Sequence, residues 1–298
     1  MIAATGATTV VTGARGRLGR AVVAGVGAAG RPVVPWDRPE YDLDVPGAAA
    51  PLLARDQPGV VIHCAAWTDV DACARDPATA MRRNARAVRE LAEATATAGA
   101  RLVLVSTNEV FDGARTDGRG YREDDPAEPP NAYGASKLAG ERAAAVAFGR
   151  AGRPADLWVI RTAWLFGPGA PDFPVKILAA ADRLPPGDPL PVVADEVGSP
   201  TYAADLAAAL LDLIERAPGG LYHLVNGGQA SRAAWAEAVL RLVGRPTAVR
   251  PIPQAAYPRP STPPRWAVLD AGRAATLGVV LRPWPDALAA RLESLTGG

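Results

Sequence analysis

The sequence predicts an α/β protein in which helices cover both faces of a doubly wound parallel sheet, with a second, smaller lobe. Three observations carry this prediction. Short β-branched runs alternate with longer Ala-rich stretches through the first half of the chain. The runs VVIHC and LVLVS are apolar on both faces, as in strands that helices cover on both sides. A glycine triplet follows the first run and opens the first Ala-rich stretch.

The elements follow in chain order from this alternation. Runs of β-branched residues predict strands, and Ala-rich stretches with helical periodicity predict helices. A polar, Gly- and Pro-rich segment predicts a long surface loop over 111–131, which ends at the N-cap of the next helix. We expect strands at 8–11, 31–36, 59–66, 101–107, 157–161 and 221–226, and helices at 18–29, 78–98 and 132–151.

Composition excludes several function classes. The 298 residues are 49% hydrophobic, and 32 Lys and Arg nearly balance 31 Asp and Glu, so a nucleic acid is not expected as a partner. The two cysteines, Cys64 and Cys73, lack metal-ligand spacing and are interpreted as reduced packing residues. The two histidines, His63 and His223, lie in apolar runs and are expected to be buried and structural. No metal site is predicted.

Membrane and export signals are also not expected. The longest apolar stretch, 21–29, is interrupted by Gly25 and Gly27 and has an amphipathic helix pattern. The first residues lack a basic region and lead directly into the glycine motif. These features predict a cytoplasmic location, and a homodimer is one of the oligomeric states that stay open.

The glycine motif predicts a dinucleotide site. Gly13, Gly16 and Gly19 stand in TGARGRLG between a strand and a helix, where glycine lets the backbone approach a pyrophosphate at the helix N-terminus. This indicates a Rossmann domain over 1–163, to which 200–228 returns. The segments 164–199 and 229–298 would then form the substrate-binding lobe.

The second strand bears on the choice of cofactor. Asp37 suits the ribose hydroxyls of NADH, whereas Arg38 suits the 2′-phosphate of NADPH. Arg15 and Arg17 add positive charge near that phosphate. We therefore expect NADPH, with NADH also possible.

Tyr133 and Lys137 form a YxxxK arrangement in NAYGASKLAGE, four residues apart on one predicted helix face. The chain has only two lysines among its 32 basic residues, so Lys at this position indicates a need for a compact ammonium. That ammonium is expected to lower the pKa of the Tyr133 phenol, which would donate a proton to a carbonyl oxygen. Thr107, at the end of its strand, would hydrogen-bond the same oxygen.

The ordered segments TGARGRLG, HCAAWTDVDACARDP, VSTNEVFDG, NAYGASKLAGE, RTAWLFGPG and VADEVGSPTYAADLA resemble the extended short-chain dehydrogenases/reductases, and most of all the dTDP-4-dehydrorhamnose reductase family. The resemblance implies reduction of the C4 ketone of a dTDP-4-dehydro-6-deoxyhexose. It assigns catalysis to Thr107, Tyr133 and Lys137. The implied cofactor-binding residues are Gly13, Arg15, Gly16, Arg17, Leu18, Gly19, Asp37, Arg38, Ala65, Ala66, Tyr133 and Lys137. The implied substrate-binding residues are Trp67, Thr68, Val70, Thr107, Glu109 and Trp164.

Departures from the family pattern keep alternatives open. Asn108 and Glu109 stand where the family usually has Asp and Tyr, Glu196 replaces a Gln, and Pro263 and Pro264 replace an Arg-Pro pair. Thr107-Asn108-Glu109 is close to the Thr-Asp-Glu triplet of nucleotide-sugar dehydratases, although an amide cannot serve as their general acid. The alternatives are a dehydratase or epimerase of the same superfamily, or a non-catalytic regulatory binding subunit that keeps the fold.

Overall fold

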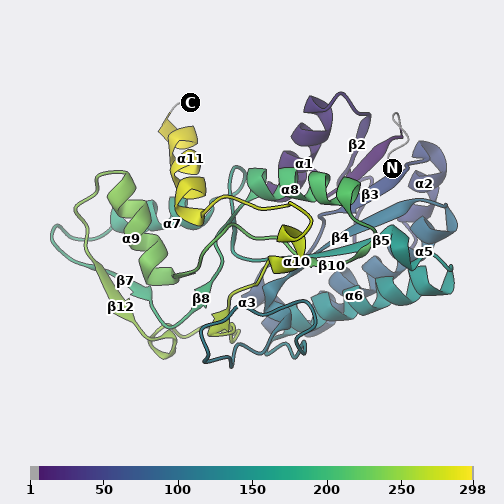
Figure 1. Cartoon of the computed structure of the whole chain (residues 1–298). Helices are drawn as coiled ribbons and strands as arrows, with labels where there is room; N and C mark the ends of the chain where they lie inside the picture. Colours follow the sequence, from purple (N-terminus) through teal and green to yellow (C-terminus); the bar gives the residue numbers. More distant parts are fainter. Residues whose placement is uncertain (1–6, 297–298) are drawn as a thin grey trace.

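A six-stranded parallel sheet forms the centre of the molecule in the computed structural model, which describes residues 7–296 (Figure 1). The strand order is β10-β5-β4-β3-β1-β2, so the winding direction changes between β1 and β3. This confirms the predicted doubly wound α/β class. The strands are β1 (Thr9–Thr12), β2 (Val33–Trp36), β3 (Val60–His63), β4 (Arg101–Thr107), β5 (Leu157–Thr162) and β10 (Gly220–His223).

Helices cover both faces of this sheet (Figure 1). On one face, α1 (Arg17–Ala28) lies beside α8 (Ala203–Arg216), and Leu18, Val22 and Val26 form the buried stripe of α1. Their spacing of four residues is the one that turns a single helix face to a sheet. The other face carries α2 (Ala49–Asp56), α5 (Ala87–Thr97) and α6 (Ala132–Arg150).

The helix predicted over 78–98 is present as an unbroken helical run over 77–97, in which one turn is π-helical. The chain forms α3 (Val70–Arg75), α4 (Pro77–Met81) and then a π-helical turn, η1 (Arg82–Arg86), before α5. Close packing accompanies this turn, because a Cβ at Gly140 of α6 would lie only 2.3 Å from the Asn84 carbonyl oxygen. The turn thereby brings the buried Asn84 against α6.

The second half of the chain builds small sheets around a separate apolar core that includes Phe166, Trp235 and Leu288. Its elements lie to the left of the main sheet in Figure 1. They are β6 (Leu165–Phe166), α7 (Phe173–Ala181), β7 (Leu190–Val193), β8 (Val197–Gly198), β9 (Thr201–Tyr202), β11 (Ala230–Ser231), α9 (Arg232–Leu242), β12 (Val249–Ile252), β13 (Trp266–Ala267) and α11 (Trp284–Thr296).

Short helices fill the connections: η2 (Asn108–Val110), η3 (Pro154–Asp156), η4 (Gln254–Ala256) and α10 (Gly272–Ala275). The segment 111–131 holds no strand or helix and is fixed by Tyr121, which stacks on Phe111 and bridges to Leu269. Within 7–296, no helix has the length and apolarity needed to cross a membrane.

Candidate active site

The glycine loop after β1 is shaped for close backbone approach. Gly13 has φ +61°, and a Cβ there would lie 2.8 Å from the backbone of Ala65. A Cβ on Gly19 would lie 2.2 Å from the Gly13 carbonyl oxygen. Gly16 caps α1 without any side-chain hydrogen bond, so the first N–H groups of the helix are available to an anion. These features fit a pyrophosphate.

A hollow of about 410 Å³ lies where β1 and β3 end, at the change in winding direction where such sheets bind ligands. Of the predicted cofactor residues it is lined by Gly13, Arg15, Gly16, Asp37, Arg38, Ala65 and Ala66. Sequence reasoning missed five other lining residues, Tyr41, Asp42, Leu43, Cys64 and Arg83. Trp67 also lines the hollow, although the sequence analysis assigned it to the substrate. Tyr133 and Lys137 do not line this hollow, whose lining combines the glycine loop with the ends of three parallel strands.

Asp37 holds the rim of this hollow together. Its Oδ2 accepts a hydrogen bond of 2.6 Å from the backbone N–H of Arg15, and its Oδ1 accepts one of 3.1 Å from that of Arg38. The Arg38 side chain is exposed beside it. The carboxylate thus orders the loop, while the guanidinium stays available to a phosphate.

Arg17 and Leu18 point away from the hollow. Arg17 donates from Nε to the Gly167 carbonyl at 3.0 Å and from Nη2 to the Ala170 carbonyl at 2.6 Å. The expectation that the Arg17 side chain adds charge near a 2′-phosphate therefore does not match its position. Leu18 is buried in the core between α1 and the sheet, and Gly19 is buried behind the loop.

Thr107, Tyr133 and Lys137 lie together where β4 meets α6, and each is less than 10% exposed. The Asn131 side chain starts α6 by accepting a 2.9 Å hydrogen bond from Gly134 N, which places Tyr133 in the first turn. Lys137, one turn later, donates from Nζ to the Val105 carbonyl oxygen at 2.7 Å. Strand and helix thus position the three predicted catalytic side chains.

Burial controls the charge of these groups. Burial, with a smaller contribution from Glu109, raises the pKa of Tyr133 above its usual value, and the Thr107 hydroxyl acts in the opposite direction. Burial also lowers the pKa of Lys137 to about 8, while Glu141 acts to raise it. The prediction that Lys137 lowers the pKa of Tyr133 is wrong, because desolvation outweighs any such effect. A neutral phenol at neutral pH suits a proton donor.

Two predicted substrate residues pack on Tyr133, the predicted proton donor. Tyr133 shares an apolar cluster with Trp67 and Val70, whereas Thr68 is exposed on the loop between them. Asn84 fixes the loop: its Oδ1 accepts from Trp67 N at 2.8 Å, and its Nδ2 donates to Trp67 O at 2.9 Å. The π-helical turn therefore sets the position of the Trp67 loop.

Glu109 is buried beside the catalytic group. Its Oε2 accepts a 2.7 Å hydrogen bond from Asn131 Nδ2, and burial raises the pKa of its carboxyl. Asn108 donates from Nδ2 to the Ala267 carbonyl at 3.1 Å, which joins the end of β4 to β13. Of the residues that depart from the family pattern, Asn108 and Glu109 are therefore both buried next to Thr107.

Trp164 lies where the main sheet gives way to the smaller lobe. Its φ of 42° is unusual for a bulky residue. The Arg232 guanidinium lies 3.5 Å above the centre of this ring, and Trp235 stacks with it at 5.9 Å. Packing against Arg232 and Trp235 therefore holds the Trp164 indole in place.

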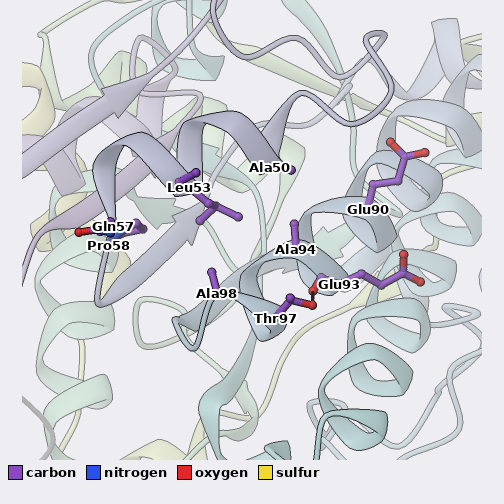
Figure 2. Close-up of a pocket in the computed structure, with 10 residues that line it drawn as sticks. Ala50, Leu53, Gln57, Pro58, Glu90, Glu93, Ala94, Thr97 and Ala98 are labelled. Carbon is purple, nitrogen blue, oxygen red and sulfur yellow. Dashed lines mark hydrogen bonds between the residues drawn. The ribbon is translucent and has the colours of Figure 1, made fainter.

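Other polar groups do not form a second site of the predicted kinds. His63 and His223 are fully buried, and among the described residues no group of three or more His, Cys, Asp or Glu could hold a metal ion. A wider hollow of about 800 Å³ lies between α2 and α5, where Leu53, Ala94 and Glu93 line it (Figure 2). None of the predicted site residues lines it.

The fold and the site define a class, the dinucleotide-dependent oxidoreductases of the extended short-chain type. The chain belongs to the RmlD substrate binding domain family, whose model matches residues 7–296. It is 39% identical to a dTDP-4-dehydrorhamnose reductase of Streptomyces griseus over 97% of this chain and 94% of that protein. A probable dTDP-4,6-dihydroxy-2-methyloxan-3-one 4-ketoreductase of Streptomyces antibioticus is 38% identical over 94% of this chain and 92% of that protein. The crystal structure of dTDP-4-dehydrorhamnose reductase from Bacillus anthracis in complex with NADP superimposes with a TM-score of 0.89 at 28% identity, covering 97% and 99% of the two chains.

Proposed function

We propose that this protein uses NADPH to reduce the C4 ketone of a dTDP-4-dehydro-6-deoxyhexose. The observation that carries the proposal is the meeting of Thr107, Tyr133 and Lys137 next to Trp67, which lines the hollow at the glycine loop. The relatives act on ketones of this class, as their names state. NADPH, when bound, supplies the hydride.

The residues of the chain would then share the remaining work. Tyr133, protonated because burial raises its pKa, donates the proton to the ketone oxygen. Thr107 holds that oxygen in line. Trp67, Val70 and Trp164 border the space for the hexose, and the Arg38 guanidinium binds the 2′-phosphate. In this account 164–199 and 229–298 form the substrate lobe, as the sequence predicts.

A dehydratase or epimerase is less well supported. The Asn108 amide stands where a dehydratase needs a general acid, and its Nδ2 already donates to Ala267. A non-catalytic binding subunit would have no need of the buried Tyr133–Lys137 arrangement. Free Cys64 and Cys73 suit a reducing compartment, so the cytoplasmic location is kept as part of the proposal. A homodimer and the exclusion of nucleic acid stay predictions.

The test follows NADPH absorbance at 340 nm with purified protein and dTDP-4-dehydro-6-deoxyhexose generated in the same tube. One NADPH consumed for each sugar reduced, with a C4 alcohol identified by NMR, is the expected result. Conversion of the sugar without NADPH consumption would favour the dehydratase or epimerase. Cofactor binding without any conversion would favour the binding subunit.

A further inference from the structure

A buried ion pair shares the helix face of Lys137. Glu141, one turn further along α6, accepts hydrogen bonds from Arg161 of β5, at 3.0 Å from Nε and 2.7 Å from Nη2. Only 8% of the Glu141 side chain and 5% of the Arg161 side chain are exposed. The Ser106 hydroxyl also donates to Glu141. The carboxylate is therefore fixed from two neighbouring strands.

The end of β4 joins this pair to the catalytic group. Three consecutive residues of the strand, 105–107, meet three successive turns of α6. Lys137 donates to the Val105 carbonyl, Ser106 donates to Glu141, and the Thr107 hydroxyl interacts with the Tyr133 phenol. Ser106, which binds the ion pair, is thus the neighbour in sequence of both Val105, which binds Lys137, and Thr107, which binds Tyr133.

Stability alone explains this pair poorly. Removing two charges from water costs several kcal/mol for each ion, so apolar residues of similar volume are often as stable or more stable. The compensation here is incomplete, since Arg161 Nη1 is buried without a hydrogen-bond partner among the described residues. A role in the adjacent site accounts for the retained charges.

The electrostatic surroundings of Lys137 indicate that role. At the end of β3, burial lowers the pKa of His63 to about 3 and raises that of Cys64 to about 12, so both are neutral near pH 7. The Tyr133 phenol on α6 is neutral for the same reason. Among the described residues that act on Lys137 electrostatically, Glu141, which is ion-paired with Arg161 of β5, acts most strongly to raise the pKa of Lys137.

We propose that Glu141 is a positioning residue for Lys137: held by Arg161 and Ser106, its carboxylate keeps the buried Lys137 ammonium charged at neutral pH. The inference rests on the proposed function for its catalytic meaning, since in that account the charged Lys137 ammonium would hold the ribose hydroxyls of NADPH beside Tyr133. The physical claim itself concerns only the pKa of Lys137, which can be measured without substrate.

The composition of the chain makes that titration directly measurable. Lys137 and Lys176 are its only lysines, so protein carrying ¹³C at lysine Cε gives two signals, which a Lys176→Arg variant assigns. In Glu141→Gln, the midpoint of the Lys137 titration is expected to fall by about 1 pH unit or more. An unchanged midpoint in the folded variant overturns the proposal.

Glu141→Gln leaves Arg161 buried and unpaired, which is a strongly destabilising change. The double variant Glu141→Gln, Arg161→Met removes both charges, and its Lys137 midpoint is also expected to fall. The matched control is Asp172→Asn with Arg291→Met, which removes an equally buried pair from the smaller lobe. The control should leave the midpoint in place, and an equal shift there would overturn the proposal.

Kinetics then connects the titration to catalysis. In the Glu141 variants the alkaline limb of the pH profile of kcat/KM should move to lower pH by the same amount as the midpoint. A lower kcat with an unmoved limb would show a merely structural role. The NMR titration needs no substrate. A wild-type protein that fails to oxidise NADPH would therefore contradict the proposed function, while the titration would still decide the inference about Lys137.

Discussion

The Asp37 carboxylate at the end of β2 accepts a 2.6 Å hydrogen bond from the backbone N–H of Arg15 in the glycine loop. A second hydrogen bond, from the backbone of Arg38, occupies its other oxygen. Asp37 therefore holds the shape of the glycine loop, and we expect the exposed Arg38 side chain to distinguish a 2′-phosphate from a hydroxyl.

Arg38→Ala is expected to raise the KM for NADPH by about 10- to 100-fold, since a hydrogen bond to a charged group contributes about 1.5–3 kcal/mol. The KM for NADH should change little. Steady-state kinetics with both cofactors checks this. Equal losses for the two cofactors would show that Arg38 does not contact the 2′-phosphate.

Tyr133→Phe should reduce kcat by about 100-fold or more, because it removes the proton donor and leaves the ring packed against Trp67 and Val70. The Kd for NADPH, measured by fluorescence, should stay within about twofold of wild type. Near-normal turnover would remove Tyr133 from the catalytic role.

Trp164→Ala should raise the KM for the keto sugar by about 10-fold, because the rigid indole held beneath Arg232 is lost. Trp164→Phe keeps an aromatic face and should retain most of the affinity. Neither change should alter the Kd for NADPH. A weakening of NADPH binding alone would place Trp164 on the cofactor side.

Acid should destabilise the protein through its histidines. Burial lowers the pKa of both His63 and His223 to about 3, so between pH 6.5 and 3 the unfolded chain binds more protons than the folded one. Stability then falls as pH falls, by about 2 kcal/mol per histidine from pH 7 to 5. Glu109, whose pKa is raised, acts in the opposite direction.

Urea unfolding at pH 7 and pH 5 measures this loss. A His223→Asn variant should show a smaller difference between the two pH values, because one of the two proton-binding sites of the unfolded chain is gone. Equal free energies of unfolding at both pH values in the wild type would contradict the burial of neutral histidines.

Local pattern predicted much of the site. Gly13, Gly16 and Asp37 follow directly from their place at strand ends, and Tyr133 and Lys137 from their spacing on a helix. Tyr41 and Asp42 were missed because an irregular loop brings them to the hollow, and Arg83 because it reaches the hollow from the π-helical turn η1.

Long-range packing accounts for the other differences. The predicted position of the Arg17 side chain was wrong because its guanidinium donates to the Gly167 carbonyl, 150 residues away in the chain. The effect of Lys137 on Tyr133 was misjudged because sequence alone does not give depth of burial, which dominates both groups. The π-helical turn at Asn84 depends on contact with Gly140, which no local pattern signals.

The most direct test of the central claim follows the hydride. The reaction is run with NADPH that carries deuterium at the transferring position of the nicotinamide, and the sugar product is examined by NMR and mass spectrometry. The account predicts one deuterium in the product, located at C4, with one NADP⁺ formed for each sugar. A converted sugar that carries no deuterium, with the cofactor unchanged, would contradict it.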